Sequence, residues 1–103
     1  MAVARSAEPL ASLVEEITDA GGSAEFKTCD VGDGNALGEL AEEISETHGR
    51  LDVLVNNAAF QVHADAIEDL STEHFTETIE TNLHGLFHMC REAVPHMKAG
   101  AAI

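Results

Sequence analysis

The stretch Leu51-Asp52-Val53-Leu54-Val55-Asn56-Asn57-Ala58-Ala59 decides how the rest of the sequence is interpreted. It is a short, mainly apolar and branched run that ends in two amides, and charged helical patterns lie on both sides of it. Such a run predicts a strand over residues 51–56 that is buried on both faces of a parallel sheet. Because open α/β sheets bind ligands at the carboxyl ends of their strands, Asn56 and Asn57 are candidate ligand-binding residues. The alternative, that both side chains satisfy nearby loop backbone, is equally open at this point.

Strand and helix patterns alternate on both sides of this stretch. Before it, strands are predicted at 2–5 and 24–29, with one helix that ends at Gly21-Gly22 and another that Asp33 caps and His48-Gly49 stops. After it, the sequence predicts a loop over 61–70, a long helix that starts at Ser71-Thr72-Glu73-His74 and runs to about Lys98, and a strand over 101–103. Strands alternating with helices of this length predict right-handed βαβ units. The predicted fold class is therefore α/β with a parallel sheet, in a single domain over residues 1–103.

The composition argues against several classes of partner and ligand. The chain has 19 acidic and 5 basic residues and a net charge of −14, which solvated acidic helix faces would explain. Nucleic acids and anionic membranes require a basic patch, so we expect neither as a partner. His84 and His88 have the spacing of metal ligands, but no third ligand accompanies them and we expect no metal. Cys29 and Cys90 stand alone, and no signal peptide or membrane-length apolar run is present, so we expect a soluble cytoplasmic protein.

Three further residues are candidates for chemistry, each with a structural alternative. Asp30 follows the 24–29 strand at the same sheet edge as the two asparagines, or it serves as a turn or cap aspartate. Asn82 falls on or beside the apolar stripe of the long helix, where a buried amide needs a partner. That partner is either the sheet edge, in a structural role, or a reacting group. Arg5 ends the first strand, where a guanidinium can pair with a phosphate or with a neighbouring glutamate.

Four motifs together resemble those of one known family, the short-chain dehydrogenases/reductases. They are the 51–59 stretch, Glu80-Thr81-Asn82-Leu83-His84-Gly85, Cys29-Asp30-Val31, and Val94-Pro95-His96-Met97-Lys98-Ala99-Gly100. The resemblance runs over essentially the whole chain, with the motifs in the family's order and at its spacings. It implies a Rossmann-like parallel sheet with flanking helices, and NAD(H) or NADP(H) bound at the carboxyl ends of the strands.

The resemblance assigns cofactor-binding roles to five residues at the strand ends. Asp30 would hydrogen-bond the adenine amine, and Val31 would flank the adenine ring. Asn56, Ala58 and Ala59 would line the adenosine ribose and the end of the central strand.

Three more residues take roles from the same resemblance. Asn57 would hold the sheet edge together, and Asn82 would match the family's catalytic asparagine, which holds a water in a proton relay. Arg5 would favour NADP(H) over NAD(H) by pairing with the 2′-phosphate. The substrate would be a small alcohol or carbonyl compound, and His63 is a candidate substrate contact.

The sequence also departs from the family pattern. Ala59 stands where the family usually has glycine, and the family's glycine-rich turn, catalytic serine and tyrosine–lysine pair have no counterpart. The chain contains no tyrosine, which the family uses as its acid or base. The resemblance therefore implies an incomplete domain, an internal fragment that is inactive alone and binds cofactor poorly. One alternative is a degenerate Rossmann-like module that uses helix 82–98 to associate with a full-length relative or to form a homo-oligomer. Another is a truncated reading frame without a role.

The family's strand order predicts how the strands of this chain pair. In that order the first strand lies between the second and the fourth. Without it, the 2–5 strand should pair with 24–29, and 51–56 should pair with 101–103. Exposed apolar sheet edges invite aggregation, so we expect the isolated chain to be marginally stable.

Overall fold

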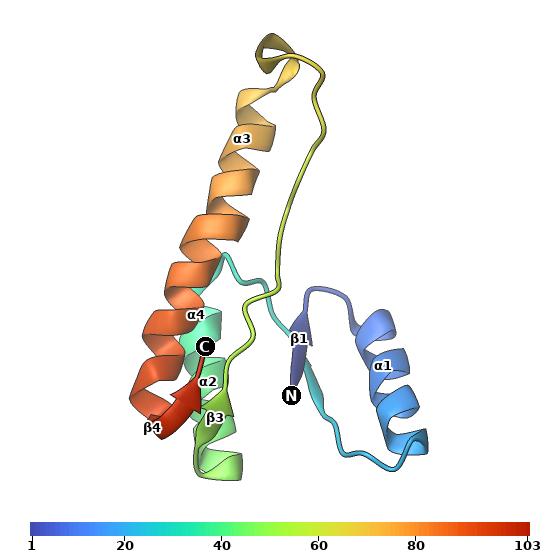
Figure 1. Ribbon diagram of the computed structural model, residues 1–103, viewed down its shortest axis with the longest axis vertical. Coiled ribbons are helices and arrows are strands. Elements are labelled where there is room, and N and C mark those ends of the chain that lie inside the picture. Colours follow the sequence, from blue (N-terminus) through green and yellow to red (C-terminus); the bar gives the residue numbers. More distant parts are fainter. The chain divides into compact units, whose positions relative to one another are not determined.

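The computed structural model describes residues 1–103 and has the alternating element order that the sequence predicts (Figure 1). The chain divides into a first unit, residues 1–30, and a second unit, residues 31–103, and each is described by itself. The first unit contains β1 (Ala2–Ala4), α1 (Ala7–Asp19) and β2 (Phe26–Thr28). The second contains α2 (Gly34–His48), β3 (Leu51–Val53), the 3₁₀ turn η1 (Ile67–Asp69), α3 (Thr72–Ile79), the π-turn η2 (Glu80–Gly85), α4 (Leu86–Ala93), the 3₁₀ turn η3 (Val94–His96) and β4 (Met97–Ala102).

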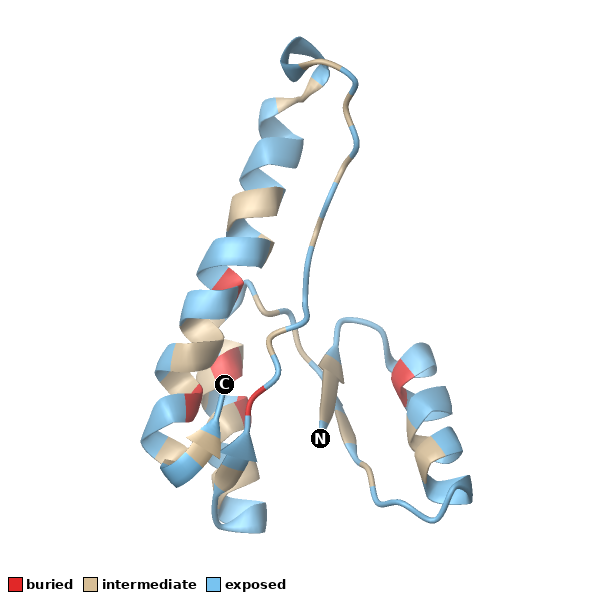
Figure 2. Cartoon of the chain, viewed as in Figure 1, coloured by how far each residue is buried: buried red, intermediate tan, exposed pale blue.

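The first unit is a βαβ arrangement with a small core. β1 and β2 are parallel, with Ala2 opposite Phe26 and Ala4 opposite Thr28. α1 contacts both strands and buries Leu10. Figure 2 colours the buried residues of the chain red. The helix ends before Gly21, as predicted, because Gly21 takes a φ of +84°, a left-handed conformation that glycine adopts without a Cβ penalty.

The second unit packs α2 against α4 and β3. β3 and β4 are parallel and the Leu54 N–H donates to the Ala102 carbonyl at 3.0 Å. The buried apolar side chains of this unit come from α2, from the residue after β3 and from α4: Leu37, Leu40, Leu54 and Ala93 (Figure 2). This core is small for a chain of this length, so few contacts hold the helices to the strand pair.

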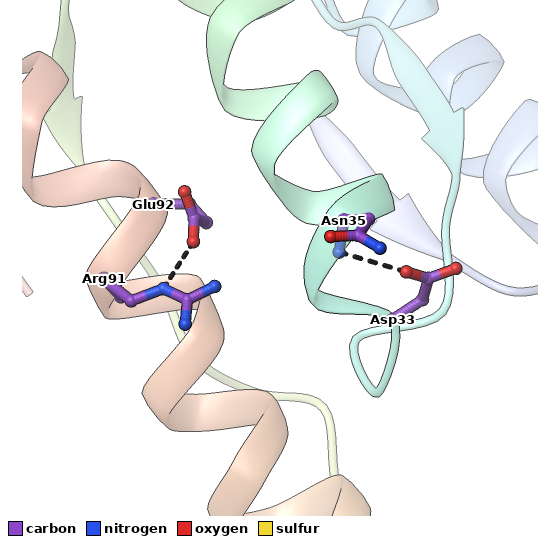
Figure 3. A network of polar contacts seen from close by, with 4 residues as sticks. All are labelled: Asp33, Asn35, Arg91 and Glu92. Atoms are coloured by element: carbon purple, nitrogen blue, oxygen red, sulfur yellow. Dashed lines mark hydrogen bonds and ion pairs between the residues drawn. The ribbon is translucent and has the colours of Figure 1, made fainter.

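Figure 3 shows local polar contacts at the start of α2 and within α4. Asp33 caps α2, as predicted: its Oδ1 accepts from the N–H groups of Asn35 at 3.0 Å and Ala36 at 3.1 Å. On α4, the Arg91 Nε donates to the Glu92 carboxylate. Glu92 lies over Gly38 of α2, since a methyl group built there would stand 3.5 Å from Glu92 Oε2. A side chain as small as a methyl group at Gly38 would therefore meet the α4 carboxylate at an ordinary contact distance.

The predicted start of the long helix is confirmed. Ser71 Oγ accepts from the His74 N–H at 3.2 Å, which satisfies one of the free donors at the helix N-terminus. A hydrogen bond from its own backbone N–H, and a second from the Ser71 hydroxyl, hold the pKa of the exposed Glu73 carboxyl below its ordinary value of 4.5. None of the helices of the chain combines the length and apolarity needed to cross a membrane.

The predicted strand pairing is confirmed. The strands form two parallel two-stranded sheets, β1 with β2 and β3 with β4. The strands themselves are shorter than predicted in three cases: β1 ends at Ala4, β2 covers Phe26–Thr28 and β3 ends at Val53. A strand without a second neighbour lacks the ladder hydrogen bonds that would extend it.

The prediction that the 51–56 strand is buried on both faces is wrong. Leu54 is buried, but Val53 and Val55 are 61% and 76% exposed. A strand is buried on both faces only when layers cover both, and β3 pairs with β4 alone and contacts α2. Because successive side chains alternate between faces, Leu54 points to the covered side while Val53 and Val55 share the other one.

The end of the long helix is also corrected. α4 ends at Ala93, η3 follows, and β4 begins at Met97 rather than at 101. Pro95 lies in η3 and explains the early end, because proline has no N–H to donate and its ring clashes with a helical carbonyl. The predicted loop over 61–70 contains one short regular element, η1.

Candidate functional site

The segment that follows β3 carries the predicted site residues of the second unit. Asn56 is half-buried, and its Nδ2 donates to the Cys90 Sγ of α4 at 3.6 Å. Asn57, Ala58 and Ala59 are exposed. The first amide is therefore fixed against a helix, while the small residues after it leave their main chain open to a ligand.

Asn82 holds this segment in place with both ends of its side-chain amide. Its Oδ1 accepts from the Phe60 N–H at 2.7 Å, and its Nδ2 donates to the Phe60 carbonyl at 2.9 Å. The Phe60 ring also lies 6.5 Å, centroid to centroid, from the ring of His74 in α3. The sequence predicts a buried amide at Asn82, but the residue is exposed. Its partner is the main chain just beyond the sheet edge, which corresponds to the structural alternative.

Asn82 lies within η2, a turn of π-helix between α3 and α4. Single π-turns inside α-helices occur frequently at functional sites. In the same turn, His84 Nδ1 and Glu80 Oε2 are 2.9 Å apart. The turn ends at Gly85, which is buried against Val31. The π-turn therefore contains one predicted site residue, Asn82, and packs against another, Val31.

The remaining predicted site residues lie in the first unit. Arg5 comes directly after β1 and is exposed. Asp30 comes after β2, whose pairing with β1 continues as the Cys29 N–H donates to the Ala4 carbonyl at 3.0 Å. Both residues are therefore at the carboxyl end of their own strand, where the resemblance requires them.

The two histidines with metal-ligand spacing, His84 and His88, contact different parts of the chain. His84 faces Glu80, and the Nδ1 of His88 is buried without a hydrogen-bond partner against Gly34 of α2. The chain holds no group of three or more His, Cys, Asp or Glu side chains that could bind a metal ion.

Sequence reasoning missed Phe60, Cys90 and Gly85. Phe60 takes part through its main chain, which no side-chain type reveals. Cys90 contacts Asn56 across 34 positions of sequence. Gly85 stands in a quoted motif, and a glycine inside a helical apolar stripe is a signal of close packing that could have been used.

The comparison with protein-family models identifies the family of this chain. The family model of the short-chain dehydrogenases matches residues 1–102, and the chain is a member of that family. The resemblance drawn from the four motifs is therefore confirmed.

Individual relatives agree with this membership. A 3β-hydroxysteroid dehydrogenase of Mediterraneibacter gnavus is 39% identical over 104 residues, which cover 100% of this chain and 38% of the relative. A metagenomic short-chain oxidoreductase, solved in complex with NADP, has a TM-score of 0.84 and 32% identity over 91% of this chain and 42% of its own. An alcohol dehydrogenase from the archaeon Thermococcus sibiricus, complexed with 5-hydroxy-NADP, has a TM-score of 0.85 and 28% identity over 95% of this chain and 42% of its own. The fold is thus Rossmann-like, and the chain spans less than half the length of these relatives.

Proposed function

We propose that the chain is part of an NAD(P)(H)-dependent oxidoreductase, with NADP(H) favoured, that acts on a hydroxyl or carbonyl group of a small molecule in the cytoplasm. The observation that carries this proposal is the pair of hydrogen bonds between Asn82 and Phe60, made in a π-turn of a chain that belongs to the short-chain dehydrogenase family. The relatives solved with NADP and 5-hydroxy-NADP support the class of cofactor.

The residues at the strand ends fit a dinucleotide. Ala58 and Ala59 are exposed and small, so a ribose can approach their main chain. Asn56 is oriented by Cys90, and the exposed guanidinium of Arg5 can pair with a 2′-phosphate. Asp30, after β2, can accept from an amine such as that of adenine. The nicotinamide of the bound cofactor supplies or accepts the hydride.

The role that we propose for Asn82 follows from its hydrogen bonds. Oδ1 and Nδ2 are both engaged by Phe60. The side chain therefore acts as a positioning group, and the main-chain carbonyl of Asn82 is the group that would hold a water for proton transfer. A π-turn supports this role because it breaks the regular ladder of helix hydrogen bonds and frees carbonyls from it.

We further propose that the 103-residue chain does not turn over substrate by itself. Proton transfer to or from the substrate oxygen requires a positioned acid or base. The chain has no tyrosine, and it contains no glycine-rich turn of the kind that receives a pyrophosphate. We expect weak cofactor binding, with a dissociation constant of about 1 mM, the weak end of specific recognition.

A titration of the ¹⁵N-labelled chain with NADP⁺ and with NAD⁺, followed by NMR, tests the cofactor proposal. We expect amide shift changes at Asp30, Val31, Asn56, Ala58 and Ala59, larger for NADP⁺ than for NAD⁺. Shift changes elsewhere and none at these amides would contradict the assigned site. Low-micromolar affinity for NADPH, or reduction of any carbonyl compound, would contradict the proposed inactivity.

Arginine variants test the preference for NADP(H). Arg5→Ala should remove the difference between NADP⁺ and NAD⁺. The matched control is Arg50→Ala, which also deletes one guanidinium but removes an ion pair with Asp52. An equal loss in both variants would show a general charge effect instead of 2′-phosphate recognition.

The apolar surface of the long helix favours a second candidate function, association with a full-length relative. Leu83, Leu86, Phe87 and Val94 are all exposed on η2, α4 and η3. Contiguous exposed apolar side chains mark interaction sites. Co-expression with a full-length short-chain dehydrogenase of the same genome should yield a complex that Phe87→Ser weakens and the control Val53→Ser does not. A monomer in such mixtures would exclude this candidate.

Sequencing of the flanking DNA separates the candidates further. A glycine-rich turn encoded upstream and a Tyr-x-x-x-Lys motif downstream, in any frame, would identify a piece of the oxidoreductase. Their absence would favour the associating module.

A further inference from the structure

Gly85 is a helical glycine that the backbone conformation does not require. Its φ is −57° and its ψ is −47°, values that any residue adopts in a helix. Glycine is disfavoured at such a position relative to alanine because it loses more conformational freedom on folding. Its presence therefore needs a reason outside the helix.

The reason is the close approach of Val31. A methyl group built on Gly85 would lie 2.9 Å from Val31 Cγ2 and 3.3 Å from both Val31 Cβ and the Val31 carbonyl oxygen. The β-branched side chain is stiff at χ1, and the carbonyl belongs to the main chain. Val31 could not make room by turning its side chain, so the main chain at Val31 would have to move.

We propose that Gly85 is a positioning residue for the adenine end of the cofactor site. By lacking a side chain, it lets the π-turn approach the main chain of Val31 and so sets where Val31 stands. This inference rests on the proposed function, in which Val31 flanks the adenine ring. The ligand class that it concerns is an adenine nucleotide.

Gly38 provides a matched control. It is also a helical glycine facing a neighbouring element, but a methyl group there would lie 3.5 Å from Glu92 Oε2, an ordinary contact with the end of a flexible side chain. Both substitutions by alanine remove a helical glycine, and only the one at Gly85 forces a main chain to move.

The test uses NMR of the full 103-residue chain with 2′,5′-ADP as the probe. In Gly85→Ala, the Val31 amide should shift even without ligand, and 2′,5′-ADP should bind at least about fivefold more weakly, since overpacking typically costs enough for such a change. Gly38→Ala should change the affinity less than about twofold, the usual range for substitutions away from a site. An unshifted Val31 amide together with unchanged affinity in Gly85→Ala would overturn the inference.

Two further results keep the inference separate from the proposed function and from misfolding. If the wild-type chain shows no shift at Asp30 or Val31 with 2′,5′-ADP, the proposed function fails, whatever Gly85→Ala does to the unliganded Val31 amide. If Gly85→Ala does not fold, the double variant Gly85→Ala/Val31→Ala, which removes the closest clashing atom, should restore the folded spectrum. Failure of that rescue would overturn the role assigned to Gly85.

Discussion

Replacing Asn82 by alanine should release the segment after β3. Asn82 makes two hydrogen bonds with the Phe60 main chain, at 2.7 and 2.9 Å, and alanine makes neither. A typical intramolecular hydrogen bond contributes roughly 0.5–1.5 kcal/mol net, so two contribute about 1–3 kcal/mol. Asn82 is exposed, and water replaces part of what is lost, which places the expected cost at about 1–2 kcal/mol.

Amide hydrogen exchange at Phe60 measures this cost locally. Because 1.4 kcal/mol corresponds to a factor of ten, Asn82→Ala should lower the protection of the Phe60 amide by roughly 5- to 30-fold. Asn82→Asp keeps an acceptor for the Phe60 N–H but replaces the donor by an oxygen facing the Phe60 carbonyl, and it should lose the larger part of the same protection. Amides in the core of α2 should be unaffected by either substitution.

Asn35→Ala is the control for the loss of an asparagine. Asn35 is exposed at the start of α2, and the Asp33 cap uses its backbone N–H, which alanine retains. Its effect should stay within about 0.5 kcal/mol. Equal protection of the Phe60 amide in Asn82→Ala and in the wild-type chain would refute the reasoning, as would the same loss in Asn35→Ala.

Four further predictions concern stability. Gly34→Ala should lower the free energy of unfolding by about 1–3 kcal/mol, because its methyl group would lie 2.8 Å from His88 Nδ1. Gly38→Ala, which meets no such clash, should raise it by roughly 0.5–1 kcal/mol. Urea titrations followed by circular dichroism measure both changes. Gly49→Ala should cost about 1 kcal/mol in the same assay, because Gly49 has a φ of +78°; an unchanged midpoint would contradict this. The pKa of Glu73 is lowered in the folded chain, so the ionised carboxylate stabilises the fold at pH values above its ordinary pKa of 4.5, and this contribution is lost as the pH falls through the folded pKa. The difference in unfolding free energy between the wild-type chain and Glu73→Gln should therefore be present at neutral pH and vanish in acid. A difference that does not depend on pH would argue against this. The isolated chain should melt below about 60 °C, within or under the usual mesophile range, and a cooperative transition above that temperature would contradict marginal stability.

The parts of the fold that depend on neighbouring residues were predictable from the sequence. Asp33 and Ser71 cap helices through backbone donors two or three positions away, and Gly21 ends α1 by its own conformation. The strand pairing was predictable only through the family resemblance. No local signal distinguishes one parallel neighbour from another.

The parts that depend on distant residues were not predictable. The exposure of Val53 and Val55 follows from which layers cover β3, and the branched composition of a strand does not contain that information. Asn82 was expected to be buried, whereas it is exposed and its partner is a main chain 22 positions away. The roles of Arg5 and Asp30 at a cofactor stay predictions.

The π-turn also changes how the sequence of the long helix should be compared with others. Successive residues of an α-helix are separated by about 100°, so the one extra residue of a π-turn rotates α4 by about that angle relative to α3. A helical wheel drawn straight through 72–93 therefore misplaces one of its two halves. Deleting a single residue within η2 would restore an uninterrupted helix and keep the spacing inside each half, but it would rotate Asn82 by about 100° relative to either α3 or α4. In an alignment, a one-residue gap between 80 and 85 should thus mark relatives that hold the segment after this strand in some other way.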